Sequence, residues 1–437
     1  MSHLGRILVV SFRFPPQNVA GCIRAIKFVK YLARHGWNVD IMVPNGSTQE
    51  GFEEELKHSK ISIIEVQCFK PFDLLLNIFK KFKRQSSMDK DTQDKASSQL
   101  SRCTTRKKSL FFQILLLLRF PDEAVFWRFH LLGAIRKYLR KFPDCKLIYT
   151  HGPPFSPFLA ILSGNRSFKR KLIFDFRDPW SKDPEINYPF GFLKSWVQGW
   201  EKRILKSGYP LVTVTHQLAK QFQMLEPSSI GKFSVITNGF DPEDFPHEIP
   251  PSVSSQFIMA HAGNLFTRNT RYFLEGLQAL VSQHPVLKPK LKVLFWGPKD
   301  LTTAQMIQDL ALEQICEMRN PIPHSQLLKE ISDISLFLLF QSYGPIDLVA
   351  LPGKIFEYAT LRRPILGFGW DGEAKRMIEN SGWGKYFTES SANEEVANKI
   401  YEYYSLWEQH RLIPFGKDES LLLVSREHLT LKLEKLF

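Results

Sequence analysis

Lys354 and Glu357 stand three positions apart in LPGKIFEYATLRRPILGF, the segment from Leu351 to Phe368. The pattern predicts a helix entered through Gly353, and residues three apart share one face of a helix. A lysine and free backbone N–H groups at a helix N-terminus suit a phosphate. A carboxylate one turn later suits the two hydroxyls of a ribose, as in dinucleotide-binding folds. The alternative is an ordinary surface Lys–Glu pair, worth only about 0.3 kcal/mol.

Two further polar residues follow predicted strands. Arg268 lies in the loop after a strand that ends at Gly263, and an arginine is suited to hold a diphosphate. An exposed loop arginine is the alternative. His151 directly follows the predicted strand at 146–150, where an imidazole can hydrogen-bond a sugar hydroxyl or a phosphate. A structural role is the alternative for this histidine.

Charged residues also gather at the end of the strand that opens FDFRDPW. This segment contains Asp175, Arg177 and Asp178. Acidic and basic groups this close together suggest hydroxyl binding or activation of an acceptor. An internal ion pair of Arg177 with either carboxylate is the alternative.

The loop FPPQNVAGCIRA joins the first predicted strand to the first helix. Such a turn brings backbone N–H groups and a helix N-terminus together, which makes an anion site. Gly21 would let a phosphate approach the backbone there, and Arg24 on the first turn either joins the site or faces solvent. A simple strand-to-helix turn is the alternative.

Apolar runs that alternate with helical patterns must position these residues. The first half contains a helix at 23–35 and strands at 6–11, 37–44, 61–66, 146–150, 171–176 and 211–215. The second half contains strands at 257–263, 292–297, 334–339 and 364–367. The predicted fold class is therefore α/β, with two Rossmann-like doubly wound domains facing across a cleft. Ligands bind at the carboxyl ends of the strands in such folds.

Composition places the domain boundaries. The segment 246–256 contains three prolines and three serines and reads as the linker. We therefore expect one domain over 1–248, with an insert at about 67–130, and a second domain over 256–410. A closing helical segment at 411–437 follows, for which packing back on the first domain is one option.

The chain is basic, with 58 Lys and Arg against 44 Asp and Glu, a net charge of +14. A basic surface favours nucleic acid, anionic lipid or a phosphorylated substrate. Nucleic acid is not expected, because no run of five basic residues, zinc-finger spacing or RNP-like motif occurs. The five scattered cysteines form no CxxC pair, which fits a reducing compartment and indicates no metal site. With no signal peptide and no span of about 20 apolar residues, we expect a cytoplasmic protein.

The insert bears on a membrane partner. It pairs basic positions with apolar ones: Lys70, Lys80, Lys81, Lys83 and Arg84 lie beside Leu74, Leu75, Leu76, Ile78 and Phe79. A basic amphipathic face binds anionic membranes, so we expect peripheral contact with the inner face of the cytoplasmic membrane. The apolar stretch at 109–118 could also be interfacial, and a buried interdomain helix is the alternative.

The ordered set of these segments resembles glycosyltransferase family 4 of the GT-B enzymes, especially the branch of bacterial polysaccharide assembly. The resemblance covers nearly the whole chain and rests on ILVVSFRFPPQNVAGCIRAIKFVKYLARHGWNVDIMVP, RFPDEAVFW, DFRDPW, VITNGFDPEDF, HAGNLFTRN, PGKIFEYATLRRPIL, DGEAKRMIENSGWGKYF and SREHLTLKLEKLF.

The resemblance implies a hexosyltransferase-like glycosyltransferase that moves a sugar from a nucleotide-sugar donor to a glycan or lipid-linked acceptor. Transfer would be retaining and would need neither a metal nor another cofactor. The first domain would face the acceptor, and the second would bind the donor. By matching motifs, the resemblance implies three catalytic residues: Arg268 and Lys354 at the diphosphate and His151 at the transferred sugar. On the donor side it implies the ribose for Glu357, the phosphates for Gly21, the sugar or phosphates for Gly372 and Glu373, and donor binding for Gly263 and Asn264. Asp175, Arg177 and Asp178 would lie on the acceptor side.

Two departures from the family pattern leave other functions open. Many members carry two glutamates separated by seven residues, and Glu357 matches the second while Val349 stands at the first. The glycine-rich first loop is reduced to Gly21. The alternatives are a GT-B enzyme that does not transfer sugar, such as a sugar-nucleotide epimerase, and a catalytically degenerate scaffold in polysaccharide assembly.

Overall fold

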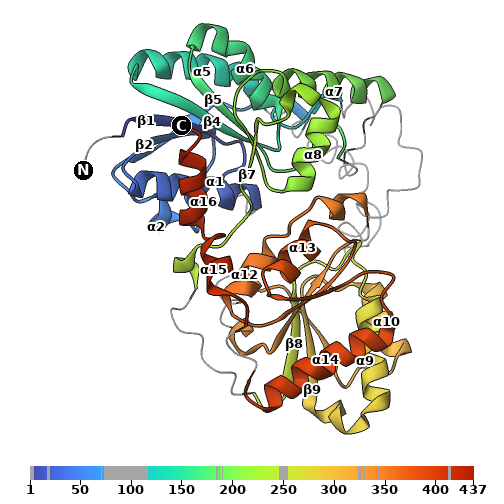
Figure 1. Cartoon of the computed structure of the whole chain (residues 1–437). Coiled ribbons are helices and arrows are strands. Elements are labelled where there is room, and N and C mark those ends of the chain that lie inside the picture. Colours follow the sequence, from blue (N-terminus) through green and yellow to red (C-terminus); the bar gives the residue numbers. More distant parts are fainter. Residues whose placement is uncertain are drawn as a thin grey trace, which may run out of the picture. The chain divides into compact units, whose positions relative to one another are not determined.

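The computed structural model describes residues 4–16, 20–69, 71–72, 117–183, 186, 188, 190–245, 254–322, 327, 330–342, 344–411 and 415–437 (Figure 1). Most of the expected insert and linker lies outside these residues. Contacts divide the chain into one unit of residues 1–212, 222–234 and 437 and a second of residues 213–221 and 235–436. The domain boundaries expected from composition stay a prediction.

The first unit is built on a seven-stranded sheet in the order β3-β2-β1-β4-β5-β6-β7. The strands are β1 (Arg6–Val10), β2 (Asn38–Pro44), β3 (Ile61–Val66), β4 (Cys145–Gly152), β5 (Lys171–Phe176), β6 (Leu211–Thr213) and β7 (Phe233–Val235). The ladders from β3 through β5 are parallel, and the order reverses at β1 as in a doubly wound fold. The last four residues of β1 are buried, as expected for a strand covered on both faces.

One strand runs farther than predicted. We expected His151 to follow its strand, but pairing with β5 continues to Gly152, so His151 lies within β4 opposite Asp175. The longer ladder holds His151 in a fixed register.

Helices connect these strands and cover the sheet. They are α1 (Ala20–Arg34), α2 (Glu53–Leu56), α5 (Trp127–Lys141), α6 (Ser156–Phe168), α7 (Gly191–Leu205) and α8 (His216–Leu225), of which residues 216–221 of α8 belong to the second unit. Helix α6 packs against both α5 and α7, so these three helices lie side by side (Figure 1).

The second unit contains a six-stranded sheet in the order β10-β9-β8-β11-β12-β13. The strands are β8 (Phe257–Ala262), β9 (Leu291–Trp296), β10 (Cys316–Arg319), β11 (Leu336–Phe340), β12 (Ile365–Phe368) and β13 (Gly384–Phe387). All of its ladders are parallel. The two sheets and their helices confirm the predicted α/β class with two Rossmann-like domains.

Each face of the second sheet has its own core. Leu336, Leu338 and Phe340 of β11 pack with α9 and α14, while Phe337 and Leu339 pack with α12 and α13. The alternation follows the period of two of a strand. The helices of this unit are α9 (Arg271–Gln283), α10 (Leu301–Asp309), α12 (Lys354–Thr360), α13 (Glu373–Asn380), α14 (Asn393–Glu408), α15 (Asp418–Leu422) and α16 (Arg426–Glu434). Within the described ranges, no helix is long and apolar enough to cross a membrane.

Candidate functional site

Lys354 lies directly over Gly263, which follows β8. A Cβ atom on residue 263 would overlap Nζ of Lys354 and lie 2.9 Å from its Cε. Gly263 also has φ of +142°, a conformation that side chains disfavour. A glycine at this position therefore makes the space that the lysine ammonium fills.

Packing of α12 against the sheet fixes the position of that ammonium. The backbone N–H of Ala262 donates to the hydroxyl of Tyr358 at 3.1 Å. The Tyr358 ring stacks on Phe337 of β11 with centroids 4.2 Å apart. Because Tyr358 lies one turn after Lys354 in α12, these contacts hold the lysine at the carboxyl end of β8.

His261 lies beneath this lysine and is the functional candidate that sequence reasoning missed. It is 2% exposed, and its Nδ1 lies 3.0 Å from the carbonyl oxygen of Leu338, which can only accept. Nδ1 therefore carries the hydrogen, and Nε2 is an acceptor with no hydrogen-bond partner among the described residues. Burial, together with the nearby charges of Lys354 and Arg268, lowers the pKa of His261 to about 3, so the ring is neutral at pH 7. The sequence signal that could have identified His261 is its position near the carboxyl end of a predicted strand, the same signal that singled out His151.

A second cation, Arg268, shares this edge of the sheet. Its guanidinium lies 4.0 Å from the buried carboxylate of Asp347, which accepts from the Ser342 hydroxyl at 3.1 Å and from the Gly344 N–H at 3.3 Å. Burial, opposed by Glu357 and assisted by Arg268, lowers the pKa of Lys354 to about 8. The two like charges repel each other, and an anion between them would relieve the repulsion.

Four other predicted donor residues belong to the same unit. Glu357 lies on α12 close enough to Lys354 to raise its pKa. A Cβ on Gly372 would lie 2.5 Å from the carbonyl oxygen of Asp347, so this glycine lets the chain pack closely. Asn264 accepts from the backbone N–H of Phe266 at 2.8 Å and shapes the loop. Glu373 begins α13 and lies 3.8 Å from Arg376.

The position of the family's first glutamate is apolar and enclosed. Val349 is buried and follows the short helical turn Pro345–Leu348. The carboxylate nearest to it along the chain is Asp347, which is already engaged by Ser342 and Gly344. Across the described ranges, no group of three His, Cys, Asp or Glu side chains is arranged to hold a metal ion.

The first unit brings a separate set of predicted residues together. Asp175 is completely buried and accepts from Nε and Nη2 of Arg24 at 2.8 Å and 3.4 Å, and from the Tyr149 hydroxyl at 2.5 Å. Arg24 is likewise fully buried, which excludes the alternative in which it faces solvent. Asp175 is thus paired with Arg24, which lies 151 positions earlier in the sequence.

His151 forms a polar contact of its own in this set. Its Nε2 lies 2.7 Å from Oγ of Ser11, and that hydroxyl donates its hydrogen to the carbonyl of Arg13. His151 Nε2 is therefore the donor to Ser11, and its Nδ1 is an acceptor. Burial lowers the pKa of His151 to about 4, with Arg177 and Arg24 lowering it and Asp175 opposing them.

Arg177 forms the ion pair that the sequence left open, and its partner is Asp178. The Arg177 Nε donates to this carboxylate at 3.0 Å, and Nη2 also contacts it. A Cβ on Gly21 would lie 2.7 Å from Nη1 of Arg177, so the guanidinium lies against the first turn of α1. The guanidinium of Arg177 therefore lies at Gly21, where the sequence predicted an anion site.

Comparison with known proteins gives a likeness of fold. No family model and no curated protein sequence matches the chain. The sucrose-phosphate synthase of Thermosynechococcus elongatus is 16% identical, with 99% of this chain and 98% of that chain covered at a TM-score of 0.59. HepE of Anabaena, solved with UDP, is 13% identical, with 98% of each chain covered at a TM-score of 0.62. A variant of TarM from S. aureus, solved with fondaparinux, α-GlcNAc-glycerol and UDP, is 11% identical, with 99% of each chain covered at a TM-score of 0.57. The chain therefore has the two-domain fold of the GT-B glycosyltransferases.

Proposed function

We propose that this protein is a glycosyltransferase that moves a sugar from a nucleoside diphosphate sugar to a hydroxyl of a glycan or lipid-linked acceptor. The observation that carries the proposal is the cation pair of Lys354 and Arg268 at Gly263, where a side chain would displace the lysine. A diphosphate is the anion whose size and charge suit two cations at the carboxyl edge of a parallel sheet. HepE and TarM, which share the fold, were solved with UDP.

The chemistry assigned to these cations is stabilisation of the leaving group. When the bond between the anomeric carbon and the phosphate oxygen breaks, negative charge develops on that oxygen. Fixed cations aimed at this charge lower the barrier, and Lys354 and Arg268 are held in place before reaction. The acceptor hydroxyl then bonds to the anomeric carbon from the leaving-group face, and its proton passes to the departing phosphate. This path retains the anomeric configuration and uses no metal.

A nucleotide panel tests the donor site. We would measure thermal unfolding of the wild type, Glu357→Ala and the control Glu395→Ala with UDP, GDP, dTDP, CMP and ADP. Glu395 is exposed in the first turn of α14, remote in sequence from α12. A ligand at 100 times its Kd adds about 2.7 kcal/mol of stability. We expect one diphosphate to stabilise the wild type and the control but not Glu357→Ala. Stabilisation by none of them would contradict the proposal.

Burial of Val349 at the family's first glutamate position supports a second candidate, a catalytically degenerate scaffold that binds the nucleotide without transfer. Release of nucleoside diphosphate that depends on an added acceptor separates the two candidates. A nucleotide-binding protein that released none with any donor or acceptor tried would be the scaffold. Isomerisation of the donor sugar without an acceptor would instead identify an epimerase.

A further inference from the structure

Two buried polar side chains at the carboxyl edge of the second sheet each have an atom with no hydrogen-bond partner among the described residues. One is His261 of β8, which is 2% exposed and whose Nε2 is an acceptor. The other is Gln341, which directly follows β11, is 1% exposed and has an unpaired amide Nε2 within the same ranges. Strands β8 and β11 are neighbours in the sheet. Buried polar groups are normally hydrogen-bonded, so these atoms at one edge indicate a ligand.

The Nε2 atom of His261 adjoins the cation pair. A Cβ on Gly263 would lie 3.7 Å from this atom and would overlap the Lys354 ammonium, so both groups border the same small volume. The charges of Lys354 and Arg268 act on the imidazole and lower its pKa. The hydrogen bond from Nδ1 to the Leu338 carbonyl fixes the orientation of the ring. An acceptor is therefore held beside the position assigned to the diphosphate.

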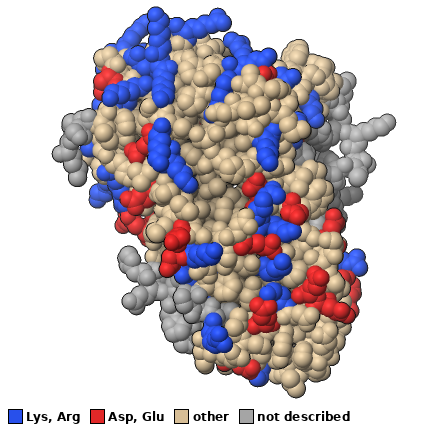
Figure 2. All heavy atoms as spheres, viewed as in Figure 1, with Lys and Arg blue, Asp and Glu red and all other residues tan. Residues whose placement is uncertain are grey.

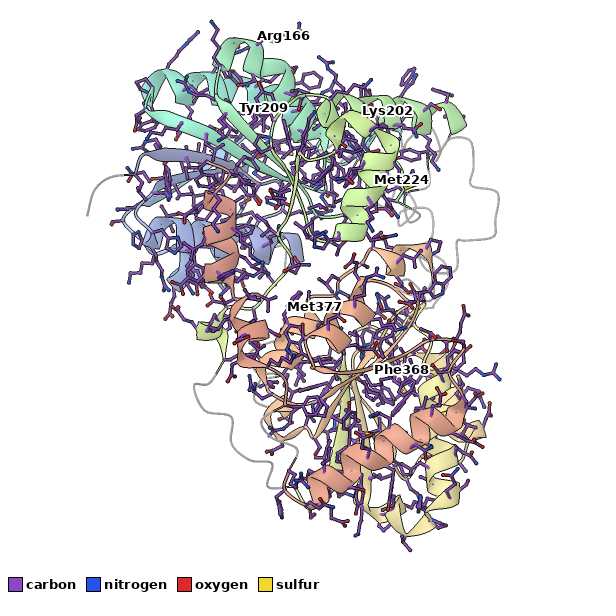
Figure 3. All side chains as sticks on the ribbon, in the orientation of Figure 1. Arg166, Lys202, Tyr209, Met224, Phe368 and Met377 are labelled. Carbon is purple, nitrogen blue, oxygen red and sulfur yellow. The ribbon has the colours of Figure 1, made fainter. Side chains whose placement is uncertain are left out.

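Gln341 is held at this edge by three neighbours. The Tyr386 hydroxyl donates to its Oε1, so its amide Nε2 remains as a donor. Its backbone N–H donates at 2.9 Å to the carbonyl of Phe368, the last residue of β12 (Figure 3). Its carbonyl accepts from the N–H of Asn269 at 3.3 Å, and Asn269 follows Arg268 in the chain. Gln341 thus adjoins the loop that carries the second cation.

These two atoms specify the chemical class of the ligand group. The phosphates of a sugar nucleotide carry negative charge and no hydrogen at pH 7, so they cannot donate to His261 Nε2. A hydroxyl both donates and accepts, so hydroxyls satisfy the imidazole acceptor and the amide donor. The groups bonded directly to the diphosphate are the ribose and the transferred sugar, and both carry hydroxyls. The nucleobase lies beyond the ribose.

Other features of the second unit do not supply these contacts. Figure 2 shows Lys and Arg interspersed with Asp and Glu on the visible face of this unit, so its surface charge does not single out a sugar site. Val349, at the family's first glutamate position, has no polar side-chain atom. The hydroxyls of a ligand must therefore be met by other side chains, and His261 and Gln341 offer one acceptor and one donor.

We propose that His261 Nε2 and the Gln341 amide bind hydroxyl groups of the sugar nucleotide next to the diphosphate, with a hydroxyl donating to His261 and a hydroxyl accepting from Gln341. This inference rests on the proposed function, because it requires Lys354 and Arg268 to hold the diphosphate. The two side chains distinguish a ligand that carries sugar hydroxyls from an anion that has none. The ribose and the transferred sugar are the two sources of such a hydroxyl.

Calorimetry of the full chain with three ligands tests the proposal. Pyrophosphate carries the phosphates without a sugar, the nucleoside diphosphate found in the thermal panel adds ribose, and its glucose conjugate adds a hexose. His261→Asn keeps a donor for the Leu338 carbonyl but lacks the acceptor at the Nε2 position. It should lower affinity for the hydroxyl-bearing ligand by about tenfold or more and leave pyrophosphate affinity unchanged. A loss already seen with the nucleoside diphosphate assigns the ribose, and a loss only with the conjugate assigns the transferred sugar.

Matched variants separate hydroxyl binding from a general effect of substitution. His261→Gln places an acceptor near the position of Nε2 and should restore affinity for the ligand that His261→Asn binds poorly. Gln341→Leu removes the amide donor and should weaken sugar-bearing ligands but not pyrophosphate; equal affinities would exclude Gln341 from hydroxyl binding. His284→Asn makes the same substitution between α9 and β9, at the opposite edge of the sheet, and should change none of the affinities. Circular dichroism melting shows that each variant folds.

Failure of this inference is distinguishable from failure of the proposed function. If the wild type binds the nucleotides and His261→Asn binds every ligand equally well, the inference is overturned while the donor site stands. Equal losses for pyrophosphate and the sugar-bearing ligands in His261→Asn would also overturn it, because His261 would then act only by positioning Lys354. If the wild type binds no nucleoside diphosphate, the donor site and the inference fail together.

Discussion

The Lys354 ammonium occupies the space that a side chain on Gly263 would need. These residues come from different elements, the loop after β8 and the first position of α12. The hydrogen bond from the Ala262 backbone N–H to the Tyr358 hydroxyl holds the two elements together. The glycine therefore permits the position of the cation, and the cation determines which ligands the site can accept.

Replacing Gly263 with alanine should remove Lys354 from the site. The new methyl group would overlap the ammonium, and φ of +142° would be strained for alanine by about 1–3 kcal/mol. We expect nucleoside diphosphate affinity to fall about tenfold or more, the scale of one charge-assisted contact of about 1.5–3 kcal/mol. Isothermal titration calorimetry with the diphosphate found in the thermal panel measures this change.

Gly382→Ala is the matched control for backbone strain. Gly382 has φ of +68°, and a Cβ there would meet no atom within 4 Å. It should lower stability without changing nucleotide affinity. Equal affinity losses in the two variants would mean that strain, rather than displacement of Lys354, weakens binding.

Lys354→Ala should lower the rate of transfer by about 10²-fold or more, the scale of losing one group that stabilises developing negative charge. The measurement is acceptor-dependent release of nucleoside diphosphate at saturating donor. Lys385→Ala, which removes a half-exposed lysine of β13 paired with Glu379, should leave the rate unchanged. Near-normal turnover of Lys354→Ala would remove this lysine from the catalytic role.

The same lysine should make nucleotide binding depend on pH. Burial lowers the pKa of Lys354 to about 8 in the free protein, so the ammonium is present below that pH and is lost above it. Binding of a diphosphate then requires uptake of a proton, and Kd should rise by about tenfold per pH unit above 8. Lys354→Arg keeps its charge throughout this range and should show a flat profile in calorimetry. A rising Kd in the arginine variant would assign the pH dependence to another group.

Local patterns in the sequence predicted the central strands well. Strands β3 and β5 span the predicted 61–66 and 171–176, and β1 ends one residue before the end of its predicted range, because these segments are largely apolar or β-branched runs. The strands β7, β10 and β13 were missed. All three lie at sheet edges, where FSV, CEMR and GKYF need no long apolar run.

The candidate site was predictable in its residue types but not in its pairings. Short spacing correctly suggested an ion pair for Arg177, which contacts Asp178. It could not connect Asp175 with Arg24, because that pair depends on how α1 packs on the sheet. The acceptor Nε2 of His261 likewise depends on the carbonyl of Leu338 in the neighbouring strand β11.

His151 should make stability depend on pH. Its pKa is about 4 in the folded chain against 6.5 for an ordinary histidine, chiefly because of burial. The unfolded chain therefore binds more protons between these values, so His151 supports stability above pH 6.5 and loses that support as pH falls towards 4. Between pH 7 and pH 5 the loss is about 2 kcal/mol. Urea unfolding at both pH values should show that His151→Gln loses less stability than the wild type; an equal loss would contradict the assignment.

The buried pair of Arg24 and Asp175 should show strong coupling in a double-mutant cycle. Arg24→Met leaves a carboxylate buried without its cation, and such a change costs about 3–5 kcal/mol. Asp175→Asn keeps an acceptor for the Tyr149 hydroxyl but leaves the guanidinium buried and uncompensated. The double variant removes both charges, so its loss of stability should be smaller than the sum of the single losses by about 2–3 kcal/mol. Urea unfolding of the four proteins measures the cycle, and additive losses would show that Arg24 is stabilised by its packing on Phe28 instead of by Asp175.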